Sequence, residues 1–196
     1  MSSTVNDAAL DIIFRKGRSF DGWQNKPVSQ ALLQAVYELM AAGPTSMNAC
    51  PARVLFLVSA AAKQRLKPHL SESNVQKSLT APAVAIIAND LEFFEHMPKL
   101  FPERPQAKDM FRQAPNNETF AMRNGTLQGG YFIIAARALG LDCGPMSGFN
   151  NDGVDKEFFA GTKIKSNFLC AVGHGDPASL PPRHPRLAFD EACKVL

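Results

Sequence analysis

Three short loops rich in small polar residues are the parts of this sequence best suited to hold a ligand. They cover residues 43–48, 74–77 and 140–148. Gly, Ser, Thr and Asn at the ends of helices and strands allow backbone N–H groups to approach a ligand closely. Arg18 near one end of the chain, and Arg183 and Arg186 near the other, could bind a phosphate. A flat ring with polar edges and a phosphate tail would use all of these groups, but three ordinary turns and solvated arginines explain the same residues more simply.

Other patterns of reactive residues favour ordinary structure. The run GHGDPA at 173–178 formally fits G-x-G-x-x-A, but its prolines prevent the helix that a dinucleotide-binding fingerprint needs. Ser147 misses the G-x-S-x-G nucleophile elbow by one position. Glu92, Glu95 and His96 share one helix face, but without an H-E-x-x-H motif a solvated surface is the better interpretation. We therefore name no catalytic side chain and no metal ligand.

Length and composition set the class of protein. The chain has 196 residues, of which 45% are hydrophobic and 20% charged, which predicts one globular domain over 1–196. The net charge of +3 (21 basic minus 18 acidic residues) is too weak to indicate a nucleic-acid-binding protein. With no secretory signal and no apolar run long enough to cross a membrane, we expect a cytoplasmic protein. The cysteines form no C-x-x-C pair, and we expect reduced thiols, mostly buried, at Cys50, Cys143, Cys170 and Cys193.

The elements that must position the loops are mostly helices. Helical patterns cover 7–16, 29–43 with Ser29 as N-cap, 60–67, 91–97 and 118–139, and a short amphipathic segment covers 189–196. Continuous apolar runs predict three buried strands at 54–58, 84–88 and 167–172. The polar, proline-interrupted stretch 100–115 predicts a mobile loop or lid. Because the strands do not alternate regularly with helices, we expect an α+β fold with a small sheet wrapped by helices.

Five sequence blocks follow one another along the chain. They are RSFDGW at 18–23, GPTSMN at 43–48 followed by PAR at 51–53, NVQKSLTAP at 74–82, ALGLDCGPMSGF at 138–149 and PRLAFDEA at 185–192. Through these blocks the sequence resembles the FMN-dependent nitroreductase family, and within it the malonic semialdehyde reductase branch of pyrimidine catabolism. The resemblance covers nearly the whole chain. It implies a nitroreductase-like fold with a mainly antiparallel sheet, built as a homodimer.

The resemblance also implies which residues contact FMN at its phosphate and ribityl end. The phosphate arginines are Arg18, Arg183 and Arg186. The polar residues around the ribityl chain and ring, which the other subunit contributes, are Thr45, Ser46 and Asn48. The chain departs from the family at Phe20 and Gly22, where further polar or basic residues are usual, and at His184, which replaces a lysine. Phosphate binding is therefore expected to rest on the three arginines.

At the flavin ring, the resemblance implies two further pairs of residues. Asn74 and Lys77 match the pair at the pyrimidine edge, where a cation would stabilise the negative charge of reduced flavin. Ser147 and Gly148 match the backbone donors that face flavin N5 and O4. Reduced nicotinamide and substrate would use the same pocket in turn, and the flavin would carry the chemistry.

The resemblance to this branch implies reduction of malonic semialdehyde to 3-hydroxypropanoate with NADPH or NADH. The alternative is a general NAD(P)H nitroreductase or NADH dehydrogenase that acts on nitroaromatics or quinones. A flavin-binding protein without turnover and a cofactor-free interaction domain also stay open. A small anionic substrate needs a cation, and the candidates are Arg104, Arg112 and Arg123. We expect partners of two kinds only, a second copy of the chain and a small-molecule substrate, with no nucleic acid or membrane.

Overall fold

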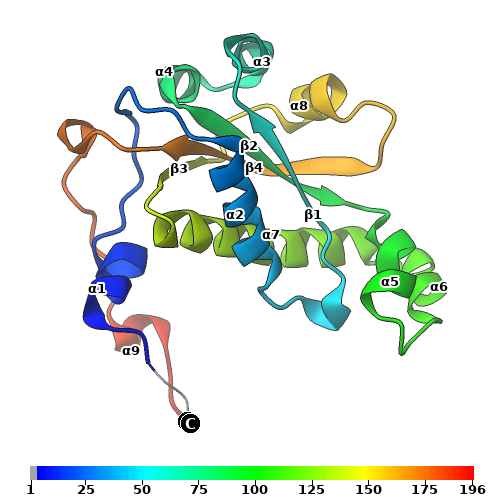
Figure 1. The fold of residues 1–196 in the computed structure, drawn as a ribbon. Coiled ribbons are helices and arrows are strands. Elements are labelled where there is room, and N and C mark those ends of the chain that lie inside the picture. Colours follow the sequence, from blue (N-terminus) through cyan, green and yellow to red (C-terminus); the bar gives the residue numbers. More distant parts are fainter. Residues whose placement is uncertain (1–3) are drawn as a thin grey trace.

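The computed structural model describes residues 4–196 and places one four-stranded sheet between two layers of helices (Figure 1). The strands are β1 (Ala52–Leu57), β2 (Ala83–Asp90), β3 (Asp142–Met146) and β4 (Ile164–Gly173). Their order across the sheet is β1-β2-β4-β3, and every neighbouring pair is antiparallel. The expected α+β fold with a small antiparallel sheet is confirmed. The edge strands β1 and β3 therefore lie at opposite edges of the sheet.

Helices cover both faces of this sheet. The helices α2 (Gln30–Ala41) and α7 (Asn117–Ala138) lie on one face, and α3 (Ala60–Leu66), α4 (Glu72–Thr80) and α8 (Asn151–Phe158) lie on the other (Figure 1). Four shorter helices lie outside these layers: α1 (Asp7–Leu10), α5 (Met97–Leu100), α6 (Ala107–Arg112) and α9 (Phe189–Ala192). In Figure 1, α1 and α9 lie near each other at one end of the molecule, and α5 and α6 lie at the other.

The long helix α7 packs on the sheet through small residues. Gly125 and Gly129 are buried and face β2 and β4. A Cβ at position 125 would collide with the Asn89 side chain, and one at 129 would come within 2.5 Å of the Phe168 ring. These glycines let the helix backbone approach the sheet, while Phe132 fills the core one turn later. The opposite face of α7 is left with exposed apolar side chains, including Met122 and Leu127.

The three predicted strands are confirmed, because their apolar runs are buried on both faces of the sheet. Residues 83–88 in β2 have no exposed surface, as expected for a strand covered by helices on both sides. Ser29 caps α2 as predicted, since its Oγ accepts a hydrogen bond of 3.1 Å from Leu32 N.

Two predicted loops are regular elements instead. The stretch 140–148 contains β3, which pairs with β4 in spite of Pro145. An edge strand tolerates a proline because one side of its backbone needs no ladder partner. The stretch 74–77 lies inside α4, whose polar sequence hid its helical character. The helix α8 was also not predicted.

The region between β2 and α7 is more ordered than predicted. Residues 91–97 form a turn and a 3-10 helix (Phe93–His96) before α5, and the supposed lid 100–115 contains α6. Phe93, Phe111 and Phe120 belong to a separate apolar cluster, in which Phe93 is stacked on Phe120 at 5.2 Å and meets Phe111 edge-to-face at 5.1 Å. We call this helical unit, residues 91–115, the cap.

Two further expectations concern helices and thiols. Within residues 4–196, no helix is both long enough and apolar enough to cross a membrane.

The four cysteines are free thiols, but only Cys143 and Cys170 are buried; Cys50 is half-buried and Cys193 is exposed. The prediction that most of them are buried is therefore wrong, because the last residues of the chain lie on the surface.

Candidate functional site

Asn74, Lys77, Ser147 and Gly148 come together where α4 meets the end of β3, and we call this group the Lys77 corner. Asn74 and Lys77 lie three residues apart, so they share one face of α4. Asn74 is buried, and its Nδ2 donates a hydrogen bond of 2.9 Å to Gly148 O. The predicted pairs 74/77 and 147/148 are thus brought together by a direct contact.

Gly148 allows this close approach of loop to helix. A Cβ at position 148 would lie 2.7 Å from Asn74 Nδ2 and 3.0 Å from Ser71 Oγ, which is too close. The N–H groups of Ser147 and Gly148 take part in none of the loop, cap or side-chain hydrogen bonds of residues 4–196. Backbone donors of this kind are available to a ligand.

A buried lysine on α3, Lys63, helps to fix the position of α4. Lys63 Nζ donates to Ala81 O at 2.6 Å and to Leu79 O at 3.2 Å, at the carboxyl end of the helix. Burial lowers the pKa of Lys63. A cation at this end also interacts favourably with the helix dipole. Lys63 thus stabilises the helix that carries Asn74 and Lys77, although it is not part of the Lys77 corner.

The segment 18–23 contacts Lys77 from the N-terminal side. Lys77 Nζ forms an ion pair of 2.8 Å with Asp21 Oδ1, and Trp23 Nε1 donates to Lys77 O at 3.0 Å. The Lys77 side chain is 13% exposed. The sequence interpretation took only Arg18 from this segment and missed Asp21, although both lie in the block RSFDGW.

Arginines gather where the N-terminal and C-terminal segments cross. Arg18 donates to Pro181 O, and Arg183 Nη2 donates to Arg15 O and Gly17 O at 2.8 and 2.9 Å. Arg137, which the sequence interpretation missed, donates from α7 to Ile13 O and Arg18 O at 3.1 and 3.2 Å. We call Arg18, Arg137 and Arg183 the arginine cluster. Each guanidinium has five N–H donors, so the two or fewer bonds formed by each leave donors for a ligand.

Arg186 lies just beyond this cluster and is exposed. Its Nη1 donates only to the neighbouring carbonyls of His184 and Pro185, both at 3.1 Å. Arg186 is therefore held by its own short segment rather than by the body of the protein. Its guanidinium can reach a ligand without breaking a contact between distant elements.

Thr45, Ser46, Met47 and Asn48 form a turn between α2 and β1, which we call the Ser46 turn. Ser46 N donates to Asn124 Oδ1 at 2.8 Å, and Asn48 Nδ2 donates to Leu100 O in the cap at 2.8 Å. Met47 and Asn48 have φ of 52°, in the left-handed region that non-glycine residues rarely adopt. The Ser46 turn precedes edge strand β1, whereas the Lys77 corner follows edge strand β3 (Figure 1).

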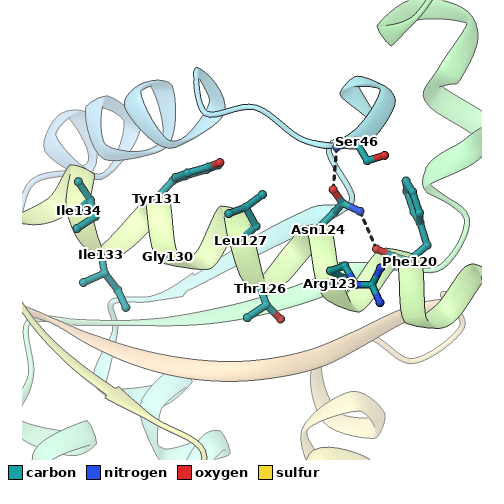
Figure 2. A pocket seen from close by; sticks show the side chains of 10 residues that line it. All are labelled: Ser46, Phe120, Arg123, Asn124, Thr126, Leu127, Gly130, Tyr131, Ile133 and Ile134. Atoms are coloured by element: carbon teal, nitrogen blue, oxygen red, sulfur yellow. Dashed lines mark hydrogen bonds between the residues drawn. The ribbon is translucent and has the colours of Figure 1, made fainter. Parts of the chain in front are cut away.

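An apolar groove runs along the outer face of α7 beside the Ser46 turn (Figure 2). It has a volume of about 910 Å³. Figure 2 shows Phe120, Arg123 and Asn124 at the end near Ser46, and Leu127, Gly130 and Tyr131 farther along the helix. One charged side chain, Arg123, therefore lies in an otherwise mostly apolar surface.

The other candidate cations and acids belong to the cap. Glu95 pairs with Lys108 at 2.6 Å and with Arg112 at 2.7 Å, and these cations lower the pKa of Glu95, Lys108 foremost. Arg112 also pairs with Asp109 at 3.1 Å. Glu95, one of the three residues considered above as a metal site, is thus used in surface ion pairs.

The donor set fits FMN in chemical type. The Lys77 corner offers an amide, an ammonium group and two backbone N–H groups, which match a ring edge that carries oxygens and nitrogens. Segment 18–23 connects this corner to the arginine cluster. The guanidinium groups of that cluster can donate charge-assisted hydrogen bonds to a phosphate. The Ser46 turn bonds to α7 and to the cap instead. Seven of the ten predicted residues therefore lie in the Lys77 corner or near the arginine cluster, and the other three, Thr45, Ser46 and Asn48, lie in a second region.

Comparison with known proteins agrees with this geometry. The family model described as "Nitroreductase family" matches residues 18–175. A protein of Cupriavidus pinatubonensis named "Putative NADH dehydrogenase/NAD(P)H nitroreductase" is 51% identical over 189 residues, covering 95% of this chain and 96% of its own. HadB of Ralstonia pickettii, which carries the same description, is 51% identical over 198 residues and covers 100% of both chains.

A solved structure shares the fold. The "putative nitroreductase in complex with FMN" from Exiguobacterium sibiricum superposes with a TM-score of 0.85 over 100% of both chains, at 20% sequence identity. The family match spans most of the chain, and the relatives are similar over their full length. The chain belongs to the Nitroreductase family.

Proposed function

We propose that this protein is an FMN-dependent NAD(P)H oxidoreductase, with the whole chain 1–196 serving as one FMN-binding domain. The observation that carries this proposal is the Lys77 corner. There the Lys77 ammonium group and the Asn74 amide on α4 lie close to the backbone N–H groups of Ser147 and Gly148. The names of its relatives, which mention NAD(P)H, and the FMN complex of a structural neighbour support it.

Each group of residues has a distinct task in this proposal. FMN, when bound, would take electrons from the nicotinamide and pass them to the substrate. Asn74 and Lys77 would orient the pyrimidine edge, and Lys77 would offset the negative charge that develops there on reduction. The N–H groups of Ser147 and Gly148 would donate to the ring, while Arg18, Arg183 and Arg186 would hold the phosphate. The chain contributes binding and electrostatics, so no acid–base pair is required.

We propose a homodimer because the site is divided. The Ser46 turn lies beside one edge strand and the Lys77 corner beside the other, which supports a site in which Thr45, Ser46 and Asn48 of one chain would contact the FMN held by another. The outer face of α7 supplies an apolar surface for this contact, with Met122 56% exposed. Four apolar residues of the C-terminal segment are also largely exposed: Leu187, Phe189, Val195 and Leu196. Light scattering that finds a monomeric FMN-bound protein would reject the dimer.

For the substrate, we propose malonic semialdehyde, with weaker activity on nitro compounds. Of the three candidate arginines, Arg112 is engaged by Glu95 and Asp109, and Arg104 lies over the Phe101 ring at 5.9 Å. Arg123 has no acidic partner within ion-pair distance among residues 4–196, and it shares the groove with Ser46. An acid bound by Arg123 would therefore lie beside the ring that Ser46 contacts.

Kinetics of two variants test this choice of substrate. Arg123→Gln is expected to raise KM for malonic semialdehyde by roughly tenfold to a hundredfold, the size of one charge-assisted hydrogen bond, and to leave a nitroaromatic unaffected. Arg104→Gln is the matched control and should change neither. A large preference of the wild-type enzyme for the nitroaromatic in kcat/KM would favour the alternative, a general NAD(P)H nitroreductase or NADH dehydrogenase, which the names of the relatives also describe.

The absorption spectrum tests the proposed cofactor itself. The purified protein should be yellow or should take up added FMN, and NADPH or NADH should bleach the bound flavin. Steady oxidation of NADPH distinguishes an enzyme from a protein that only binds flavin. A colourless protein that takes up no FMN would overturn the proposed function.

A further inference from the structure

Asp21 forms an ion pair with the cation of the Lys77 corner. Its Oδ1 lies 2.8 Å from Lys77 Nζ. The Asp21 side chain is 59% exposed, whereas that of Lys77 is 13% exposed. The acidic partner therefore faces solvent, and the lysine lies largely beneath it. The segment that carries Asp21 is also held by hydrogen bonds of Phe20 and Trp23.

Two hydrogen bonds on either side of Asp21 fix its position. Phe20 N donates to Cys143 O in β3 at 3.0 Å, and Trp23 Nε1 donates to Lys77 O on α4 at 3.0 Å. Asp21 lies between these two anchors, so its backbone is tied to both elements that build the Lys77 corner. The carboxylate is thus held by the fold rather than by its ion pair alone.

A carboxylate at this position weakens the positive field of Lys77. Opposite charges 2.8 Å apart offset each other at any point several ångströms away, and the effect is larger in a partly desolvated site than in water. Reduced FMN carries more negative charge at its pyrimidine edge than oxidised FMN does. A partly neutralised Lys77 therefore favours the reduced form less than a free ammonium group would.

We propose that Asp21 is a positioning residue for the FMN site, which orients Lys77 and lowers the reduction potential of the bound flavin by offsetting its charge. This inference rests on the proposed function, in which Lys77 faces the pyrimidine edge. A lower potential makes the reduced flavin a stronger donor to the substrate. Asp21 itself touches neither flavin nor substrate in this proposal.

The test is the reduction potential of bound FMN in Asp21→Asn, measured by dye-equilibrated titration. The potential should become more positive, with the affinity for reduced relative to oxidised FMN rising on the order of tenfold, which is about 30 mV for a two-electron couple. Asp21→Glu keeps the charge and should retain the wild-type potential. Glu72→Gln removes the same charge from the first turn of α4 and should have little effect.

A double-mutant cycle shows whether Asp21 acts through Lys77. In a Lys77→Met background, Asp21→Asn should no longer shift the potential. An equal shift in both backgrounds would mean that the carboxylate acts on the ring directly, and no shift in either would mean that it does nothing; both results overturn the proposal. Failure of the wild-type protein to bind FMN would instead contradict the proposed function, and with it this inference.

Discussion

The Lys77 corner and the Ser46 turn are built in opposite ways. In the corner, side chains bond to one another and to nearby backbone: Asn74 binds Gly148 O, and Lys77 pairs with Asp21. In the turn, Ser46 N donates to Asn124 on α7 and Asn48 Nδ2 donates to Leu100 O in the cap, while Ser46 and Asn48 both stay exposed. The corner is thus closed within its own chain, whereas the turn presents polar groups outward. We infer that the Lys77 corner of one chain binds the polar edge of its flavin ring, and that the Ser46 turn of the same chain contacts the flavin of a second chain.

Separating two chains should have the largest effect. Leu127→Asp adds a charge to the outer face of α7, where Leu127 is 45% exposed. In a monomer this change should alter the free energy of unfolding by less than about 0.5 kcal/mol, as for other surface substitutions. In a dimer it would bury an unpaired carboxylate, so sedimentation should find monomers and FMN affinity should fall on the order of a hundredfold.

Leu127→Met serves as the control, since it keeps the apolar surface. Unchanged FMN affinity in a Leu127→Asp monomer would show that the Lys77 corner binds FMN without the Ser46 turn. That result would remove the reason for treating the two regions as halves of one site.

Loss of Arg186 should come next. Arg186→Ala should weaken FMN binding by about 1.5–3 kcal/mol, the usual cost of losing a hydrogen bond to a charged group. The fold should be intact, because Arg186 bonds only to its neighbours His184 and Pro185. Equilibrium titration with FMN measures the change, with Lys194→Ala in the same exposed segment as control. Equal affinities in wild type and Arg186→Ala would mean that this arginine is a solvated surface group.

Removing the cation of the Lys77 corner should act on rate more than on binding. Lys77→Met removes the charge but keeps an unbranched side chain of similar size. It should slow reduction of the flavin by NADPH on the order of tenfold, while FMN affinity changes less, because in this proposal the charge that Lys77 offsets develops during the reaction. Stopped-flow absorbance gives the rate, and titration gives the affinity. If affinity falls as much as the rate, Lys77 serves only to bind the cofactor.

The smallest effect concerns the cap, which contacts the Ser46 turn through Asn48. Lys108 and Arg112 lower the pKa of Glu95, so this pair stabilises the folded protein above the ordinary pKa of glutamate and loses that effect as the pH falls through the lowered value. Glu95→Gln should therefore have a slightly lower Tm than wild type at pH 7, and the difference should shrink below about pH 4. A difference that persists at low pH would assign the effect to packing.

The parts of the fold that could be predicted are those specified by local sequence. The strand at 84–88 is a continuous apolar run, and Ser29 precedes a periodic helix, so both follow from short-range patterns. The strand β3 was missed because Gly144 and Pro145 disfavour strands, and only its place at the sheet edge makes them acceptable. Helix α4 was missed because it buries only Asn74 and Ser78 and so lacks an apolar face.

The candidate site could be predicted only through the family resemblance. Asn74 and Gly148 are far apart in sequence, and no local pattern indicates that Gly148 must lack a side chain to accommodate Asn74. The ion pair of Asp21 with Lys77 depends on how segment 18–23 crosses α4, which is a tertiary property. The placement of the Ser46 turn beside the opposite edge strand likewise follows from the strand order rather than from the sequence around it.

The claim that each site is shared by two chains can be tested by mixing two inactive variants. One carries Lys77→Met together with Asn74→Ala, and the other carries Thr45→Ala together with Ser46→Ala and Asn48→Ala. If each site combines the corner of one chain with the turn of the other, mixed dimers contain one intact site, and random mixing restores about a quarter of the wild-type sites. FMN-dependent NADPH oxidation should recover accordingly after the subunits are unfolded and refolded together. If both regions served the same chain's site, every site would keep a defect, and no recovery would contradict the account.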